Sequence, residues 1–325
     1  MAHPASDSDW MAATARLATR ARPASCPNPG VAALLVRDGR VAARGWTQAG
    51  GRPHAEALAL AGLEAGGAKG AALYVTLEPC AHVSQRGPAC TDLVINARPS
   101  RVVIGQLDPD PRTAGLGIKR IERAGIAVKV LSDAASRASL AGYLARADHN
   151  RPYVTLKLAM SLDGCIALSD GTSQWITGDA ARAHVHAQRA RNDAILVGGA
   201  TWRADRPRLD VRLPGLKARS PQRVLLTRGI APDDVSVINR PDQISELEGV
   251  QYLYVEGGAG AAASFLAEDL VDEIHLYRAP IVIGGGLPAL GDIGLGALGD
   301  AHGRWQLSER RQLGSDEFTA YLRTR

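Results

Sequence analysis

The order of hydrophobic and polar positions along the chain predicts short strands that alternate with helices. Apolar runs of five to seven residues, such as AALYVTL at 71–77 and RVVIG at 101–105, are typical of buried strands. Helices are predicted between such runs, for example over 54–63, 90–97 and 116–124. Strands interleaved with helices indicate a mostly parallel sheet with helices on both faces.

Two places depart from this alternation and predict hairpins. Strands expected at 31–36 and 41–46 are joined through Asp38-Gly39, a dipeptide that favours a two-residue turn. The stretch RWQLSERRQLGSDEFTAYLR at 304–323 is predicted as the second hairpin. Before it, EIHLYRAPIVIGGG at 273–286 is predicted as one strand.

The same pattern divides the chain in two. A chain of 325 residues is long enough for two domains. A helix expected over 133–149 closes the first series of elements, and a new series starts after HNRP at 149–152. We therefore predict an α/β fold of two three-layer domains, residues 1–148 and 149–325.

Composition limits the class of protein. The chain is 46% hydrophobic and 22% charged, which is typical of globular domains. It has no apolar run of about 18 residues, and its start, MAHPASDSDW, does not resemble a signal peptide. Four cysteines form no disulfide framework. We expect a cytoplasmic protein whose thiols are free to bind metal.

The net charge of +5 is unevenly distributed. Residues 1–148 contain 18 Lys+Arg and 12 Asp+Glu, whereas residues 149–325 contain 20 and 21. A basic first half suits anionic ligands such as phosphates, although an ordinary solvated surface also explains it. The chain has no Lys/Arg-rich run and no aromatic ladder, so a nucleic acid partner is not expected. Without a long apolar run, a membrane partner is not expected either.

The strongest chemical signal comes from residues at predicted helix starts. His54 and Glu56 begin one helix, Cys80 follows a strand, and Cys90 opens another helix. Three nitrogen and sulfur ligands that leave a fourth position for water are typical of a catalytic zinc site. Glu56, beside the ligands, could carry the water's proton to a leaving amine. The alternative is a helix-cap His with two buried Cys, but the joint pattern of HAE, PC and a later Cys favours zinc.

The spacing of the two cysteines distinguishes this site from nucleic-acid-editing deaminases. The nine residues AHVSQRGPA separate Cys80 from Cys90, whereas the signature of those enzymes has two. The insert adds His82 and Arg86, which could reach an anionic group of the substrate. A solvated loop charge explains Arg86 equally well.

A second feature lies in the C-terminal half. In VEGGAGAAASFL at 255–266, a predicted strand ends at Glu256 and a glycine-rich turn leads into a helix. Small residues there allow backbone N–H groups to approach an anion at the helix N-terminus. A tight turn without a ligand explains the same residues, and the pattern is not the dinucleotide fingerprint G-x-G-x-x-G.

Four motifs together resemble the bifunctional bacterial deaminase–reductase family of riboflavin biosynthesis. They are CPNPGVAALLV, GGRPHAEALAL, YVTLEPCAH…GPAC and LKLAMSLDGCIA, and the resemblance extends from about residue 10 to the end. It implies a cytidine-deaminase-like domain with one Zn²⁺, followed by a dihydrofolate-reductase-like domain that uses NADPH. The implied reactions are deamination of 2,5-diamino-6-(5-phosphoribosylamino)pyrimidin-4-one and reduction of the ribosyl group of 5-amino-6-(5-phosphoribosylamino)uracil to ribityl.

The resemblance also implies roles for individual residues. In the deaminase, Glu56 is catalytic, the metal ligands are His54, Cys80 and Cys90, and Asn28 joins His82 and Arg86 as substrate contacts. The implied cofactor-binding residues are Ala159, Trp175, Thr201, Asp205, Gly258, Ala259, Gly260, Ala261, Ala262, Ala263 and Ser264. The implied reductase-substrate residues are Lys157, Ser173, Arg189, Leu209, Arg212 and Glu256, and Asp163 lies in the same motif as Lys157. Expected partners are small phosphorylated pyrimidines and, since the family commonly forms dimers or tetramers, further copies of this chain.

The sequence departs from the family at three positions that bear on the sites. Thr47 stands where many members have His, and Arg206 replaces the second acid of a DDP motif. Arg228 stands where a small cofactor-contacting residue is common, and an Arg there could favour the 2′-phosphate of NADPH. The residues suggest no role for Cys26 or Cys165 beyond that of a small buried side chain.

Three hypotheses follow. The first is the two-step enzyme of riboflavin synthesis. The second is a nucleic-acid-editing deaminase with an accessory domain, which would require a Cys-x-x-Cys spacing and a basic, aromatic face. The third is a non-catalytic, zinc-stabilised structural or regulatory module whose reductase half has decayed, supported only by the changes at Thr47 and Arg206.

Overall fold

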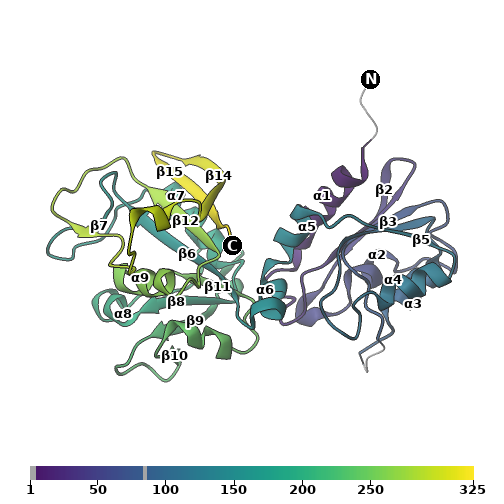
Figure 1. Ribbon diagram of the computed structural model, residues 1–325, viewed down its shortest axis with the longest axis horizontal. Coiled ribbons are helices and arrows are strands. Elements are labelled where there is room, and N and C mark those ends of the chain that lie inside the picture. Colours follow the sequence, from purple (N-terminus) through teal and green to yellow (C-terminus); the bar gives the residue numbers. More distant parts are fainter. Residues whose placement is uncertain (1–4, 83–85) are drawn as a thin grey trace. The chain divides into compact units, whose positions relative to one another are not determined.

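The computed structural model describes residues 5–82 and 86–325, and the chain forms two compact units, Met1–Asn150 and Arg151–Arg325 (Figure 1). Each unit has its own sheet and its own hydrophobic core. Across the described ranges, no helix combines the length and the apolar character needed to cross a membrane.

The sheet of the N-terminal unit has five strands. Their spatial order is β2 (Arg40–Trp46), β1 (Ala32–Arg37), β3 (Ala72–Leu77), β4 (Arg101–Gln106) and β5 (Ala127–Val130). β1 is antiparallel to β2 and β3, whereas β3, β4 and β5 are parallel. The predicted hairpin between β1 and β2 is confirmed, since Asp38 and Gly39 form its turn with φ values of 50° and 69°.

Helices cover both faces of this sheet (Figure 1). They are α1 (Asp7–Ala18), α2 (Ala55–Ala59), α3 (Cys90–Ala97), α4 (Leu116–Arg123), α5 (Ala134–Ser139) and α6 (Ala141–His149). Adjacent residues of β1 point to opposite faces, so Leu34 packs with Met11 of α1 while Leu35 packs in the core that contains Val94 of α3 and Ile121 of α4. The three layers match the predicted architecture.

Two predicted helices of this unit are shorter than expected. The helix over 54–63 is reduced to α2, because the chain turns at Gly62 and Gly66 with φ values of 78° and 74°. The helix over 133–149 is interrupted at Leu140, whose ψ of 6° separates α5 from α6.

The sheet of the C-terminal unit has eight strands. In spatial order they are β10 (Ser236–Ile238), β9 (Gln222–Leu226), β8 (Ala194–Gly198), β11 (Tyr252–Val255), β6 (Tyr153–Met160), β12 (Glu273–Arg278), β15 (Asp316–Arg323) and β14 (Trp305–Leu313). The strands from β10 to β12 are parallel, and β15 and β14 add the predicted antiparallel hairpin at one edge.

The helices of this unit also lie on both faces. α7 (Asp179–Arg189) packs over Tyr254 and Tyr277, and α9 (Ala259–Ala267) packs through Phe265 over the opposite face. α8 (Gly199–Asp205) follows β8 and was not predicted. Within residues 5–82 and 86–325, the short 3₁₀ turns are Thr19–Ala21, Ala49–Gly51, Lys217–Arg219, Pro241–Glu246 and Leu298–Ala301.

The strand predicted over 273–286 ends at Arg278. Ala279 makes a last backbone bond to Met160, and Pro280, which has no N–H to donate, follows it. The chain then leaves the sheet and forms β13 (Leu287–Pro288), which pairs with β7 (Cys165–Ala167) in a separate two-stranded ribbon.

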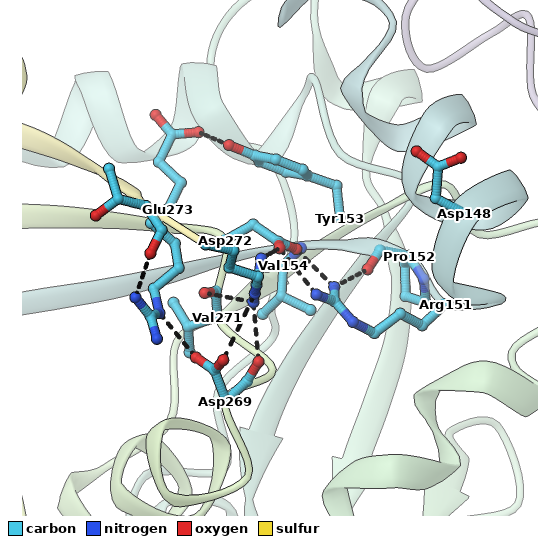
Figure 2. A network of polar contacts seen from close by, with 12 residues as sticks. Asp148, Arg151, Pro152, Tyr153, Val154, Asp269, Val271, Asp272 and Glu273 are labelled. Atoms are coloured by element: carbon cyan, nitrogen blue, oxygen red, sulfur yellow. Dashed lines mark hydrogen bonds and ion pairs between the residues drawn. The ribbon is translucent and has the colours of Figure 1, made fainter. Parts of the chain in front are cut away.

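A buried ion pair fixes the start of β6 (Figure 2). Arg151 donates from Nη1 and Nη2 to the two oxygens of Asp272, at 2.6 and 2.9 Å, and the two side chains are only 10% and 7% exposed. Asp272 also accepts the backbone N–H of Val154 and pairs with Arg325. The charges of this core region are therefore paired.

Candidate active sites

The predicted zinc ligands converge in the N-terminal unit. His54 caps the start of α2, Cys80 follows the end of β3, and Cys90 is the first residue of α3. His54 Nδ1 lies 3.3 Å from Cys90 Sγ and 3.7 Å from Cys80 Sγ, and all three ligand atoms lie within 4.8 Å of one another. A tetrahedral zinc ion with bonds of about 2.1 Å to nitrogen and 2.3 Å to sulfur separates such atoms by about 3.6 Å. The donor set therefore fits Zn²⁺.

The two thiols form a hydrogen-bonded pair. The Cys90 thiol donates to Cys80, which lowers the pKa of Cys80 to about 4, and Cys80 Sγ also accepts the backbone N–H of Cys90 at 3.3 Å. The same hydrogen bond between the thiols, with burial, raises the pKa of Cys90. A metal cation binds thiolates in place of their protons, so this pair is suited to exchange a proton for a cation.

Glu56 lies beside the ligands in a small buried cavity. It is the second residue of α2, is 3% exposed, and shares the cavity with His54 and Cys80. Burial, together with the nearby charge of Cys80, raises the pKa of Glu56 to about 7. A carboxyl with this pKa can both accept and release a proton near neutral pH.

A second cavity, of about 280 Å³, lies within the C-terminal unit. Strands, helices α7 and α8 and the segment 173–177 surround it. Most of the reductase residues expected from the sequence line it, namely Lys157, Ala159, Ser173, Trp175, Arg189, Thr201, Asp205, Leu209, Arg212, Glu256 and Gly258. The carboxyl ends of parallel strands, where ligands of open α/β sheets bind, supply several of them.

A buried charge cluster forms one side of this cavity. Arg189 binds Glu256 through two parallel hydrogen bonds, Nε to Oε1 at 2.6 Å and Nη2 to Oε2 at 2.9 Å. Lys157 Nζ lies 3.9 Å from Glu256 Oε2. Burial alone would raise the pKa of Glu256, but the charge of Arg189 lowers it overall, whereas burial lowers the pKa of Lys157. Glu256 is therefore an anion that binds Arg189 and lies beside the amino group of Lys157.

Comparison with known proteins assigns both units. Residues 4–106 match the cytidine and deoxycytidylate deaminase zinc-binding region, and residues 152–317 match the RibD C-terminal domain. The chain belongs to the RibD family. Its family membership decides among the three hypotheses, since RibD proteins are deaminase–reductases of riboflavin biosynthesis.

This chain matches RibD proteins of other organisms over most of their length. The chain is 34% identical to the riboflavin biosynthesis protein RibD of Escherichia coli (95% of this chain, 97% of the relative). It is 39% identical to that of Corynebacterium ammoniagenes (83% and 84%). Among solved structures, Acinetobacter baumannii RibD superimposes with a TM-score of 0.86 at 32% identity, covering 98% of this chain and 99% of that one.

A second solved structure names both activities. It is a diaminohydroxyphosphoribosylaminopyrimidine deaminase/5-amino-6-(5-phosphoribosylamino)uracil reductase from Thermotoga maritima, with a TM-score of 0.84, 28% identity and coverage of 98% and 99%. The chain is thus a RibD-type enzyme with a zinc deaminase domain and a reductase domain of the NADPH-using type.

The three expected contacts of the deaminase substrate lie in different places. Asn28 lines the Glu56 cavity and donates to the carbonyl of Gly51 at 3.2 Å. His82 Nδ1 lies 3.5 Å from Thr113 Oγ1, and Arg86 donates to the carbonyl of Gly50 at 2.7 Å. Arg86 borders a neighbouring cavity that also contains His54 and Cys90. The rest of the insert, residues 83–85, lies outside the described ranges.

Thr47 is buried in the wall of the Glu56 cavity. Its hydroxyl accepts the backbone N–H of Val31 at 3.0 Å. In this RibD chain the residue thus joins two backbone segments beside the zinc ligands, a bond that the sequence pattern did not indicate.

Sequence reasoning missed two buried acids that line the same cavity, Glu78 and Asp108. Glu78 accepts backbone N–H groups of Gly115 and Ile118 at 3.0 and 3.2 Å. Asp108 accepts the hydroxyl of Tyr143 at 2.7 Å, and burial raises its pKa. Both follow neighbouring parallel strands, β3 and β4, and an acid just beyond a strand end was the available signal.

The expected cofactor segment 258–264 is only partly in the reductase cavity. Gly258 caps α9, and its backbone N–H donates to Thr201 Oγ1 at 3.0 Å. The remaining residues form the first turns of α9, where Ala261, Ala262 and Ala263 are buried. Ala259, Gly260 and Ser264 do not line the cavity among the described residues.

The two reductase positions that depart from the family, Arg206 and Arg228, are not among the described residues that line the reductase cavity. Arg206 ends α8 with a left-handed φ of 41°, directly after Asp205, which lines the cavity. Arg228 is exposed just beyond β9. Trp175 is 63% exposed, and the guanidinium of Arg182 lies 4.6 Å from its ring centre.

Proposed function

We propose that the N-terminal unit removes a ring amine from 2,5-diamino-6-(5-phosphoribosylamino)pyrimidin-4-one. The C-terminal unit then reduces the ribosyl group of the product, 5-amino-6-(5-phosphoribosylamino)uracil, to ribityl. The single observation that carries the first step is the convergence of His54, Cys80 and Cys90 on the buried cavity of Glu56.

In this proposal each deaminase residue has one task. Zinc, when held by the three ligands, activates water for attack on the ring carbon that bears the amine. Glu56 takes the proton of the water at its carboxylate and delivers it to the departing nitrogen. Asn28, fixed by its bond to Gly51, orients the pyrimidine in the same cavity.

In the reductase, the cluster around Glu256 positions the sugar. NADPH, when bound, supplies the hydride. Glu256 holds Lys157 in the cavity, where Nζ can donate a hydrogen bond to a sugar oxygen. Arg189 makes two hydrogen bonds to Glu256, whereas Arg212 is 53% exposed and has one ion-pair contact, from Nε to Asp210 Oδ1 at 3.6 Å. Arg212 is therefore the better candidate to bind the substrate phosphate.

Incubation with the diaminopyrimidine substrate tests both steps. Without NADPH we expect only the deaminated product, and with NADPH the ribityl product. Glu56→Gln should lower the deaminase rate at least 100-fold, since it removes the proton carrier, while zinc content and reductase rate stay unchanged.

The matched control is Glu64→Gln, which changes an exposed carboxylate of the same unit and should leave both rates unchanged. A Glu56→Gln enzyme with the full deaminase rate, or a purified chain without about one zinc, would contradict the proposed site.

We also propose that the enzyme forms a homo-oligomer, a dimer or tetramer. The basis of this proposal is that members of the family commonly form such oligomers. Light scattering of the purified enzyme tests this, and a mass of one chain across micromolar concentrations would refute it.

A further inference from the structure

We propose that Asp163 is a positioning residue of the reductase, whose carboxylate fixes segment 281–291 as a wall of the cofactor cavity. Asp163 follows β6 within the motif KLAMSLDG, and the steps proposed above do not use it. The inference rests on the proposed cofactor site of the C-terminal unit.

The carboxylate of Asp163 gathers several donors although it is exposed. It accepts the backbone N–H groups of Ile283 and Gly284 at 3.1 and 2.8 Å, and the hydroxyl of Ser161 at 2.5 Å. The backbone N–H of Leu162 adds a bond to the carbonyl of Ile281 at 2.8 Å. The bonds that the carboxylate accepts, that of Ser161 first and then those of Gly284 and Ile283, lower the pKa of Asp163 to about 2, so it is an anion at neutral pH.

We call these bonds to the Asp163 carboxylate the Asp163 anchor. Beyond it, segment 281–291 continues into the β7–β13 ribbon. β13 pairs with β7 through Leu287 and Ala167, and Ala289 donates its N–H to the carbonyl of Gly164 at 2.9 Å. Gly286 is required by the close approach, since a Cβ there would lie 2.3 Å from the carbonyl oxygen of Ala167. The ribbon is thus held at both ends by the turn that contains Asp163.

The ribbon reaches the reductase cavity at two points. Ile166 of β7 and Ala289 line the cavity, and Ala289 is only 6% exposed. Two residues later, the N–H of Gly291 lies 3.4 Å from the carbonyl oxygen of Ala259, in the first turn of α9. A loss of the Asp163 anchor should therefore shift the cavity wall and its contact with the start of α9.

The accessibility of the Cys165 thiol gives an independent measure of whether the ribbon stays in place. Its side chain is 6% exposed, and its Sγ lies 3.5 Å from the carbonyl oxygen of Gly284 and 3.8 Å from Asp163 Oδ2. If segment 283–284 detaches, this thiol becomes accessible to an alkylating reagent. The thiol reaction does not require NADPH.

Asp163→Asn tests the proposal in the full-length zinc enzyme. An amide offers one acceptor oxygen in place of two, so it leaves Ile283 or Gly284 without its partner. We expect the KM for NADPH to rise about tenfold or more, with kcat within about twofold. Iodoacetamide should label Cys165, located by peptide mass, at least about tenfold faster, and the deaminase rate should not change. Asp233→Asn, at an exposed carboxylate of the same unit, is the matched control and should behave as wild type.

Gly286→Ala provides a second route to the same state, because its Cβ must push β13 away from β7. It should reproduce the rise in KM and the labelling of Cys165, and the double variant should be less than additive. Wild-type KM and labelling in both variants would overturn the proposal, as would a fall in kcat and thermal stability without a change in KM. An unmodified enzyme that fails to bind NADPH would instead refute the proposed cofactor site, whereas Cys165 labelling would still report on the anchor.

Discussion

At the scale of single residues, Arg189 and Glu256 bind each other inside the reductase cavity. The family resemblance implies that Arg189 contacts the reductase substrate, but its guanidinium makes two hydrogen bonds to Glu256 and a third to the carbonyl of Asp210. A guanidinium with three of its donors engaged has little left for a phosphate. Arg212 is half exposed and has one ion-pair contact, from Nε to Asp210 Oδ1 at 3.6 Å, so the substrate contact depends on how many donors of each arginine are already engaged.

We expect the buried carboxylate of Asp272 to stabilise the C-terminal unit (Figure 2). Asp272→Asn should lower the free energy of unfolding of the C-terminal unit by about 3 kcal/mol or more, because it leaves buried Arg151 without its counter-charge. Urea denaturation, monitored through the loss of reductase activity, measures this free energy of unfolding.

The pH dependence of the same pair has a defined sign. Burial alone would raise the pKa of Asp272, but the hydrogen bonds of Arg151 lower it overall. Its contribution is therefore present above the ordinary Asp pKa of about 4 and is lost as the pH falls below it, in wild type but not in Asp272→Asn. Asp242→Asn, which breaks the exposed pair with Arg240, is the control and should change stability little. An Asp272 variant as stable as this control would refute the prediction.

At the scale of elements, the position of α2 depends on one glycine of a neighbouring strand. A Cβ on Gly45 of β2 would lie 2.2 Å from the carbonyl oxygen of Ala55 and 2.6 Å from the backbone nitrogen of Ala59. Both atoms belong to α2, which carries Glu56 and begins directly after His54. The close packing of β2 and α2 therefore positions a metal ligand and the proton carrier together.

Gly45→Ala should separate α2 from β2 and displace His54 and Glu56 from the cysteines. We expect at least a tenfold loss of zinc affinity and of deaminase rate, with the reductase rate retained. Competition with a chromogenic zinc chelator measures the affinity. Arg44→Ala, at the exposed neighbouring position, should leave both unchanged, and a Gly45→Ala enzyme with normal zinc affinity would show that α2 is held by other contacts.

At the scale of the whole molecule, the two chemistries occupy separate units. Each unit has its own hydrophobic core, and the residues that line each cavity come from one unit alone. The zinc site and the reductase cavity therefore share no lining residue among those described.

Removal of zinc tests this separation. After treatment with a strong chelator, deamination should stop, whereas reduction of supplied 5-amino-6-(5-phosphoribosylamino)uracil by NADPH should stay within about twofold of the untreated rate. Added Zn²⁺ should restore deamination. A parallel loss of both activities would show that the reductase depends on the metal site.

Local sequence patterns were sufficient for the parts of the molecule that depend on neighbours in the chain. Hydrophobic periodicity predicted the α/β layers and helix α3, because side-chain burial repeats with the period of each element. The Asp38-Gly39 dipeptide predicted the hairpin, because these residues tolerate the positive φ values of its turn. The residues HAE, PC and the later Cys indicated the zinc site, because each ligand stands at the end of an element that the local pattern predicts.

Only the tertiary structure decided which distant groups meet. Glu78 and Asp108 share the Glu56 cavity because parallel strands end side by side, and Arg189 binds Glu256 across 67 positions of sequence. Asp163 meets Gly284, 121 residues away, after the chain leaves the sheet at Pro280. Such contacts depend on strand order and on where each strand ends, and neither property is a local feature of the sequence. The sequence by itself thus determined the two chemistries of this enzyme, and its folding in space decided which charges remain free to serve them.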